Sequence, residues 1–214
     1  MSAPTATPAA TVACVVEQVR YAIGAGIDVV QLRERDLEAA ELYRLARDIV
    51  QLVRGSRTKV VINDRLDVAL AAGADGVHLR ADAVRAARVR SLAPRGFLVG
   101  RSVHAAPEAE VEAEGADYLI AGTVWPTLSK TADHQLLGLH GLSEIVRAVG
   151  IPVLAIGGVS LDRLRQVAQT GAAGVAGIGL FMTEGADTKN GCGAMALHAL
   201  AQAAREAWGG PSIR

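Results

Sequence analysis

Short apolar runs rich in β-branched residues alternate along the chain with longer amphipathic segments. The short runs have the length of buried strands, and the longer segments repeat their apolar residues with the period of a helix. The expected strands are 28–33, 59–63, 75–79, 97–102, 117–122, 152–158 and 174–179. The regular alternation of strand and helix predicts a parallel sheet covered by helices.

This pattern favours an α/β protein of the (β/α)8 TIM-type barrel class, with parallel strands and a first strand that is degenerate or missing. The segment TVACVV (11–16) is the only candidate for that strand, and it overlaps the start of a predicted helix. A doubly wound open sheet is the alternative. The length of 214 residues fits one barrel. We expect a flexible tail at 1–11, a single barrel domain at 12–208 and a second tail at 209–214.

Composition narrows the classes of function. The formal net charge is zero, which gives no argument for binding nucleic acid or a membrane surface. No apolar run reaches the roughly 20 residues that a membrane span needs. Cys14 and Cys192 lack the spacing of a metal site, and two such thiols are typical of a cytoplasmic protein. The apolar face of the last predicted helix, 195–208, could serve a homo-oligomer.

Polar and basic side chains follow most of the predicted strands. In a parallel barrel the carboxyl ends of the strands form the active site. Arginine, lysine and hydroxyl groups at these ends suit an oxyanion, although charged residues at strand ends are also explained by simple solvation. The glycines at 157–158 and 177–179 predict a phosphate held by backbone N–H groups. With no nucleophile motif recognisable, the predicted chemistry is positioning and charge stabilisation.

Six stretches in this order carry a recognisable pattern: VQLRERDL (30–37), VVINDRLDVALAAGADGVHL (60–79), GRSVH (100–104), GADYLIAGTVWPTLSK (115–130), IPVLAIGG (151–158) and GVAGIG (174–179). Together they resemble the thiamine phosphate synthase/TenI family. The family has a (β/α)8 barrel. Its synthases are transferases that join hydroxymethylpyrimidine diphosphate to a thiazole phosphate, releasing diphosphate and forming thiamine phosphate. The resemblance thus implies two small-molecule substrates and Mg²⁺ as cofactor.

The resemblance also implies roles for individual residues. The implied catalytic residues are Lys130, Arg33 and Ser102. The implied substrate-binding residues are Gln31, Arg35, Asn63, Thr127, Ser129, Gly158, Ile178 and Gly179. The implied Mg²⁺ ligands are Asp64 and Asp82. The segment 132–141 is the candidate for a lid over the diphosphate.

Two departures from the family pattern keep other functions open. Where synthases read GQED after GVHL, this chain has Arg80 at the glycine position and Ala83 at the aspartate position, with Asp82 one residue earlier. Where the family's thiazole tautomerases carry a histidine, this chain has Thr123. The alternatives to a synthase are a TenI-type thiazole tautomerase and a non-catalytic barrel that binds a phosphate ligand.

Overall fold

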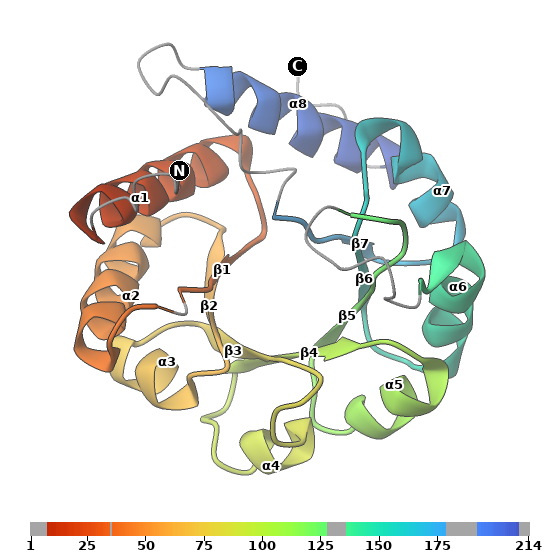
Figure 1. The fold of residues 1–214 in the computed structure, drawn as a ribbon, viewed down its shortest axis with the longest axis horizontal. Helices are drawn as coiled ribbons and strands as arrows, with labels where there is room; N and C mark the ends of the chain where they lie inside the picture. Colours follow the sequence, from red (N-terminus) through yellow and green to blue (C-terminus); the bar gives the residue numbers. More distant parts are fainter. Residues whose placement is uncertain (1–7, 35, 128–135, 179–191, 210–214) are drawn as a thin grey trace, which may run out of the picture.

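A computed structural model describes residues 8–34, 36–127, 136–178 and 192–209. Strands line the inside of a ring of helices (Figure 1). The strands are β1 (Val29–Leu32), β2 (Lys59–Asn63), β3 (Gly76–Leu79), β4 (Leu98–Val103), β5 (Tyr118–Gly122), β6 (Val153–Ile156) and β7 (Gly174–Val175). The helices are α1 (Pro8–Ala25), α2 (Ala39–Val53), α3 (Leu66–Ala72), α4 (Ala86–Arg90), α5 (Ala106–Glu112), α6 (Gly138–Ala148), the 3₁₀ turn η1 (Leu161–Arg163), α7 (Leu164–Gln169) and α8 (Cys192–Ala207).

The strands form one parallel sheet in the order β1-β2-β3-β4-β5-β6-β7. A doubly wound sheet would reverse its strand order at one point, and this sheet does not, so that alternative is wrong. The sheet curls into a half-barrel, which confirms the predicted class. Within the described residues β1 and β7 do not pair with each other. No described helix combines the length and the apolar character of a membrane span.

The segment 11–16 is helical, which corrects its reading as a candidate strand. It lies in α1, where Val12, Val15, Val16 and Val19 recur with helical spacing and pack against the core. From residue 8 onward, where the description of the chain starts, no strand precedes β1. Helix α1 begins at Pro8, within the segment 1–11 that the sequence assigns to a tail.

The main core fills the space between the sheet and the helices. All four residues of β3 are buried, and α2 buries Leu42, Leu45 and Ile49 against the sheet. A reciprocal capping box between Glu38 and Glu41 fixes where α2 begins. Burying each large aliphatic side chain of this kind stabilises the fold by about 1.5–3 kcal/mol.

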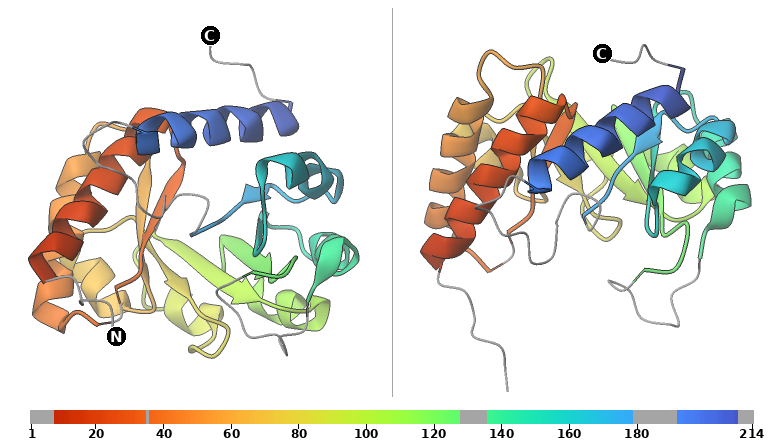
Figure 2. Two further views of the ribbon diagram at one scale, coloured as in Figure 1. Left: turned by 45° about the horizontal axis from the view of Figure 1, so that its top comes forward. Right: turned by 90° about the horizontal axis from the view of Figure 1, so that it is seen from above.

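Helix α8 crosses the side of the ring where β1 and β7 are unpaired (Figure 2). A separate apolar cluster joins it to α1. Its members are Ala22, Ala25, Leu197, Leu200 and Ala201. The Arg205 guanidinium donates to the carbonyl oxygens of Ala25 (3.0 Å) and Gly26 (2.7 Å). Three residues further along, just beyond the end of α8, the Trp208 indole donates to the carbonyl of Ala172 at 2.6 Å, just before β7. The helix is thus bonded to both sides of the gap.

Candidate active site

A row of hydrogen bonds joins the carboxyl ends of β1 and β2. The Gln31 amide Nε2 donates to Asn63 Oδ1 at 2.9 Å, and Asn63 Nδ2 donates to Asp64 Oδ2 at 3.2 Å. The register of the two strands explains this contact. Gln31 and Leu32 of β1 pair with Val61 and Ile62 of β2, which places the two strand ends side by side. The structure therefore brings together three of the residues that the sequence assigned to one site.

Asp64 adopts a left-handed backbone conformation with φ of 57°. For a non-glycine residue this is uncommon, although aspartate tolerates it better than most. Its backbone N–H donates to the carbonyl of His78 at 2.9 Å, and its Oδ1 accepts from the backbone N–H of Arg80 at 2.8 Å. These bonds tie the end of β2 to the end of β3.

The guanidinium of Arg80 lies between the two predicted metal ligands. Its Nε is 3.3 Å from Asp64 Oδ2 and donates to Asp82 Oδ1 at 2.8 Å, while its Nη2 is bonded to Asp82 Oδ2. The three side chains are 41%, 25% and 68% exposed, in the order Arg80, Asp64, Asp82. The hydrogen bond from Arg80 lowers the pKa of Asp82, and the same bond raises the pKa of Arg80.

A second polar group lies on β3, β4 and β5. His78 is buried, with its Nε2 2.9 Å from Ser102 Oγ and its Nδ1 3.3 Å from the Tyr118 hydroxyl. The rings of His78 and Tyr118 are stacked, with centroids 5.7 Å apart. Burial, followed by the positive charges of Arg101 and Arg33, lowers the pKa of His78 to about 4. Burial also raises the pKa of Tyr118.

His78 was not singled out as a site residue on sequence grounds, although a signal for it exists. It is the polar residue of a strand that is otherwise Gly76, Val77 and Leu79, all buried. A glycine at position 100 makes room for it, since a Cβ there would be 2.6 Å from His78 Nδ1 and would overlap the Tyr118 ring. A polar residue inside an apolar strand, opposite a glycine on the next strand, marks this position.

Arg101 points away from the mouth of the half-barrel. It is 3% exposed and donates to the carbonyl oxygens of Ala81 (2.9 Å), Val84 (2.9 Å) and Ala83 (3.3 Å). Its Nη2 also pairs with buried Glu112 at 3.3 Å. Glu112 in turn accepts the backbone N–H of Ala86 at the start of α4. This ion pair therefore holds the β3–α4 loop, which carries Arg80 and Asp82, from behind.

The ends of β5 and β6 run close together. The backbone N–H groups of Val124 and Trp125 donate to the carbonyls of Ile156 (2.9 Å) and Gly157 (3.0 Å). Gly158 has a φ of 62°, and a Cβ at this residue would lie 2.6 Å from Trp125 Cβ, so a side chain is excluded there. The Arg163 guanidinium donates to the Gly158 carbonyl at 2.6 Å and lies 5.0 Å from the centre of the Trp125 ring.

Of the remaining residues that the sequence assigns to the site, the structure describes some and leaves others outside its described ranges. Arg33 is exposed just beyond β1, and Thr127 is half-buried beyond β5. Ile178 is 48% exposed beyond β7. Arg35, Ser129, Lys130 and Gly179 lie outside the described residues. Of the segment predicted as a lid, 132–141, the residues from Gly138 onward form the first turn of α6, and residues 132–135 lie outside the described part.

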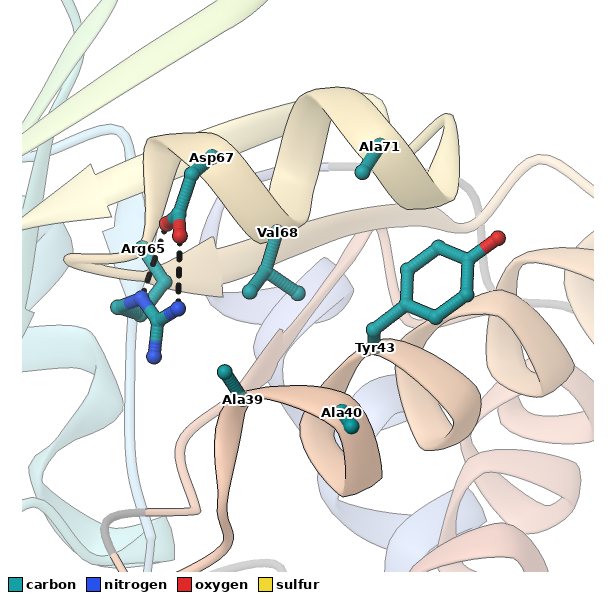
Figure 3. A pocket seen from close by; sticks show the side chains of 7 residues that line it. All are labelled: Ala39, Ala40, Tyr43, Arg65, Asp67, Val68 and Ala71. Carbon is teal, nitrogen blue, oxygen red and sulfur yellow. Dashed lines mark hydrogen bonds and ion pairs between the residues drawn. The ribbon is translucent and has the colours of Figure 1, made fainter.

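A hollow of about 390 Å³ lies outside the sheet, between α2 and α3 (Figure 3). Most of the side chains that line it are small or apolar. The lining residues are Ala39, Ala40, Tyr43, Arg65, Asp67, Val68 and Ala71. Arg65 and Asp67 bond each other here, with Nε to Oδ1 at 2.9 Å and Nη2 to Oδ2 at 2.7 Å. The side chain of Arg65 is therefore paired at this outer hollow, although its chain neighbour Asp64 belongs to the polar row at the strand ends.

Comparison with known proteins gives a consistent result. Residues 5–181 match the family model described as thiamine monophosphate synthase. The thiamine-phosphate synthase of Methanoregula boonei is 43% identical over 161 residues, which cover 75% of this chain and 74% of that protein. The thiamine-phosphate synthase of Pyrococcus horikoshii is 40% identical over 168 residues, covering 78% and 80%. The structure of thiamine phosphate pyrophosphorylase from Pyrococcus furiosus superposes with a TM-score of 0.78 at 38% identity, covering 90% of each chain.

Proposed function

Because the chain belongs to the thiamine monophosphate synthase family, we propose that it couples hydroxymethylpyrimidine diphosphate with thiazole phosphate to give thiamine phosphate and diphosphate. The observation that carries the proposal is the bonded row of Gln31, Asn63 and Asp64 across two neighbouring strand ends. Amide and carboxylate groups fixed in this way can orient a diphosphate ester before it reacts.

In the proposed reaction, the bond between the pyrimidine methylene carbon and the diphosphate oxygen breaks, and its electron pair leaves with diphosphate. The thiazole nitrogen then supplies the electron pair for the new C–N bond. Arg33 and Lys130 would stabilise the negative charge on the departing diphosphate, the role of Lys130 resting on the family motif alone. Removing one such preorganised donor typically costs about 10²–10³ in kcat.

Ser102 and His78 would lie near the pyrimidine, which becomes cationic when diphosphate leaves. The hydroxyl of Ser102 is oriented by His78 Nε2 at 2.9 Å. With a pKa of about 4, His78 is neutral near neutral pH. A neutral ring adds no positive charge beneath a pyrimidine that must itself become cationic, so the lowered pKa favours this chemistry.

For the thiazole phosphate we propose contacts with Thr127, Ser129, Gly158, Ile178 and Gly179. What supports this is the close approach of the β5 and β6 ends, where Gly158 leaves no room for a side chain. Backbone N–H groups in glycine-rich loops are well suited to hold phosphate.

Mg²⁺ is proposed as the metal that accompanies the diphosphate. No group of three or more His, Cys, Asp or Glu side chains gathers within the described ranges. The donor chemistry nevertheless fits, because Mg²⁺ in such sites takes one or two carboxylates and completes its shell with phosphate oxygens and water. Asp64 and Asp82 would hold it, and when bound it would neutralise charge on the leaving diphosphate.

A thiazole tautomerase has less support. Thr123, at the position of the tautomerase histidine, is buried at 4% exposure, and a threonine hydroxyl is a poor proton shuttle near neutral pH. A cytoplasmic location and a homo-oligomeric state stay predictions from the sequence.

The test is to incubate the purified protein with both substrates and Mg²⁺ and to measure thiamine phosphate. Lys130→Ala should lower kcat by about 10²–10³. The control is Lys59→Ala, since Lys59 begins β2 at the opposite end of the sheet and is paired there with Asp75. If the folded wild-type protein makes no product, the proposal is wrong, and the thiazole substrate alone then tests for tautomerase activity.

A further inference from the structure

We propose that Arg80 is a built-in cation that competes with Mg²⁺ for the carboxylates of Asp64 and Asp82. The position of one nitrogen atom suggests this, because Arg80 Nε lies 3.3 Å from an oxygen of Asp64 and 2.8 Å from an oxygen of Asp82. A guanidinium and a metal ion cannot both lie between the same two carboxylates. Mg²⁺ therefore binds this pair only when the guanidinium leaves it.

The arrangement is held at several points and is more than one flexible side chain meeting another. The backbone of Arg80 is fixed by its N–H bond to Asp64 Oδ1 at 2.8 Å. The loop that follows is fixed by Arg101, which donates to the carbonyls of Ala81 and Val84, both at 2.9 Å. Because both ends of the pairing are positioned by the fold, the guanidinium is directed at the carboxylates before any metal or substrate arrives.

The exposure of these groups sets how strong the competition is. The Arg80 side chain is 41% exposed and Asp82 is 68% exposed, so water screens their attraction. The pairing is weak enough for Mg²⁺ to displace it and strong enough to lower the affinity for Mg²⁺. Removing one positive charge from a partly exposed site should raise the affinity for a divalent cation by about tenfold.

The experiment measures metal binding directly, by calorimetry with Mg²⁺ and by the spin-resonance signal of free Mn²⁺. Neither substrate is present. Arg80→Met, which keeps the unbranched stem of the side chain and removes its charge, should bind both ions about tenfold more tightly than the wild type. In Arg80→Met/Asp64→Asn the gain should disappear, because the freed carboxylate is lost.

The chain offers a matched control. Arg65 and Asp67 have the same spacing and the same two-bond geometry, with Nε and Nη2 each bonded to one carboxylate oxygen, but their pair lines the outer hollow (Figure 3). Arg65→Met removes the same charge and should leave metal affinity unchanged. Thermal unfolding of each variant checks that the fold is kept.

Three outcomes would overturn the inference. These are equal affinity in wild type and Arg80→Met, an equal gain in Arg65→Met, and a gain that survives the loss of the Asp64 charge. The inference rests on the metal assigned to the proposed function, yet its test needs no turnover. A protein without synthase activity that shows the Arg80 effect would refute the proposed reaction and support the competition, whereas an active synthase without the effect would do the reverse.

Discussion

The buried His78 should make the stability of the protein depend on pH in a defined window. Its pKa falls from 6.5 to about 4 on folding, chiefly because the ring is removed from water. Above about pH 6.5 the ring is neutral in both folded and unfolded chains, and it contributes no pH dependence. As the pH falls below that value the unfolded chain gains a proton that the folded chain does not, so the folded state loses stability until the folded pKa is reached.

The magnitude follows from the shift. Each pKa unit corresponds to about 1.4 kcal/mol, so lowering the pH from about 7.5 to about 5 should cost about 2 kcal/mol through this residue alone. The assay is urea unfolding across this range for the wild type and for His78→Gln, whose amide nitrogen can still reach Ser102 and does not titrate. The difference between the two curves removes the contribution of the carboxylates, which titrate in both proteins.

His140→Gln is the control for this experiment. His140 is 85% exposed and pairs with Glu144 on the surface of α6, so its loss should leave the pH dependence as in the wild type. Parallel stability curves for wild type and His78→Gln would refute the reasoning, because they would mean that the buried ring takes up a proton in the folded state at its ordinary pKa.

Two further predictions concern the shell around the site. Arg101→Met should lower the free energy of unfolding by about 3 kcal/mol, because the buried Glu112 carboxylate loses its nearest cation and keeps only the Ala86 N–H and the more distant Arg85 at 3.9 Å. Urea titration measures this, and Arg101→Met/Glu112→Gln should recover part of the loss. Gly100→Ala should cost about 1–3 kcal/mol, because the new methyl group would be forced against the Tyr118 ring and His78; a thermal melt equal to that of the wild type would contradict this.

The sequence was informative wherever periodicity and chain order decide the outcome. The strands 59–63 and 117–122 lie within a residue of their observed bounds, and the ends of consecutive parallel strands had to meet. The joining of Gln31, Asn63 and Asp64 could therefore be predicted. The structure of 11–16 could not be predicted, because its apolar residues fit both a short strand and one face of a helix, and packing against the core decided for the helix.

Side-chain direction was harder to predict than position. Arg101 lies near the end of the predicted strand 97–102, yet its side chain points outward. Successive side chains of a strand alternate between its two faces, so this direction follows once Ser102 is taken to face inward. The meeting of Arg80 with both aspartates depends on the path of the β3–α4 loop. That path is set by Arg101 and Glu112, which are distant from it in sequence, so no local pattern reports it.

The gap between β1 and β7 has a mechanical consequence for the whole molecule. In a closed barrel, hydrogen bonds around the full circle fix strand tilt and diameter together. Here that geometric closure is lacking in the described sheet, and the spacing across the gap depends on α8, bonded at Arg205 to the end of α1 and at Trp208 to the residues before β7. The separation of β1 and β7 at their amino ends is thus set by a helix on the outer surface, so we expect substitutions in the contacts of α8 to change the curl of the sheet and, through it, ligand affinity at the opposite edge.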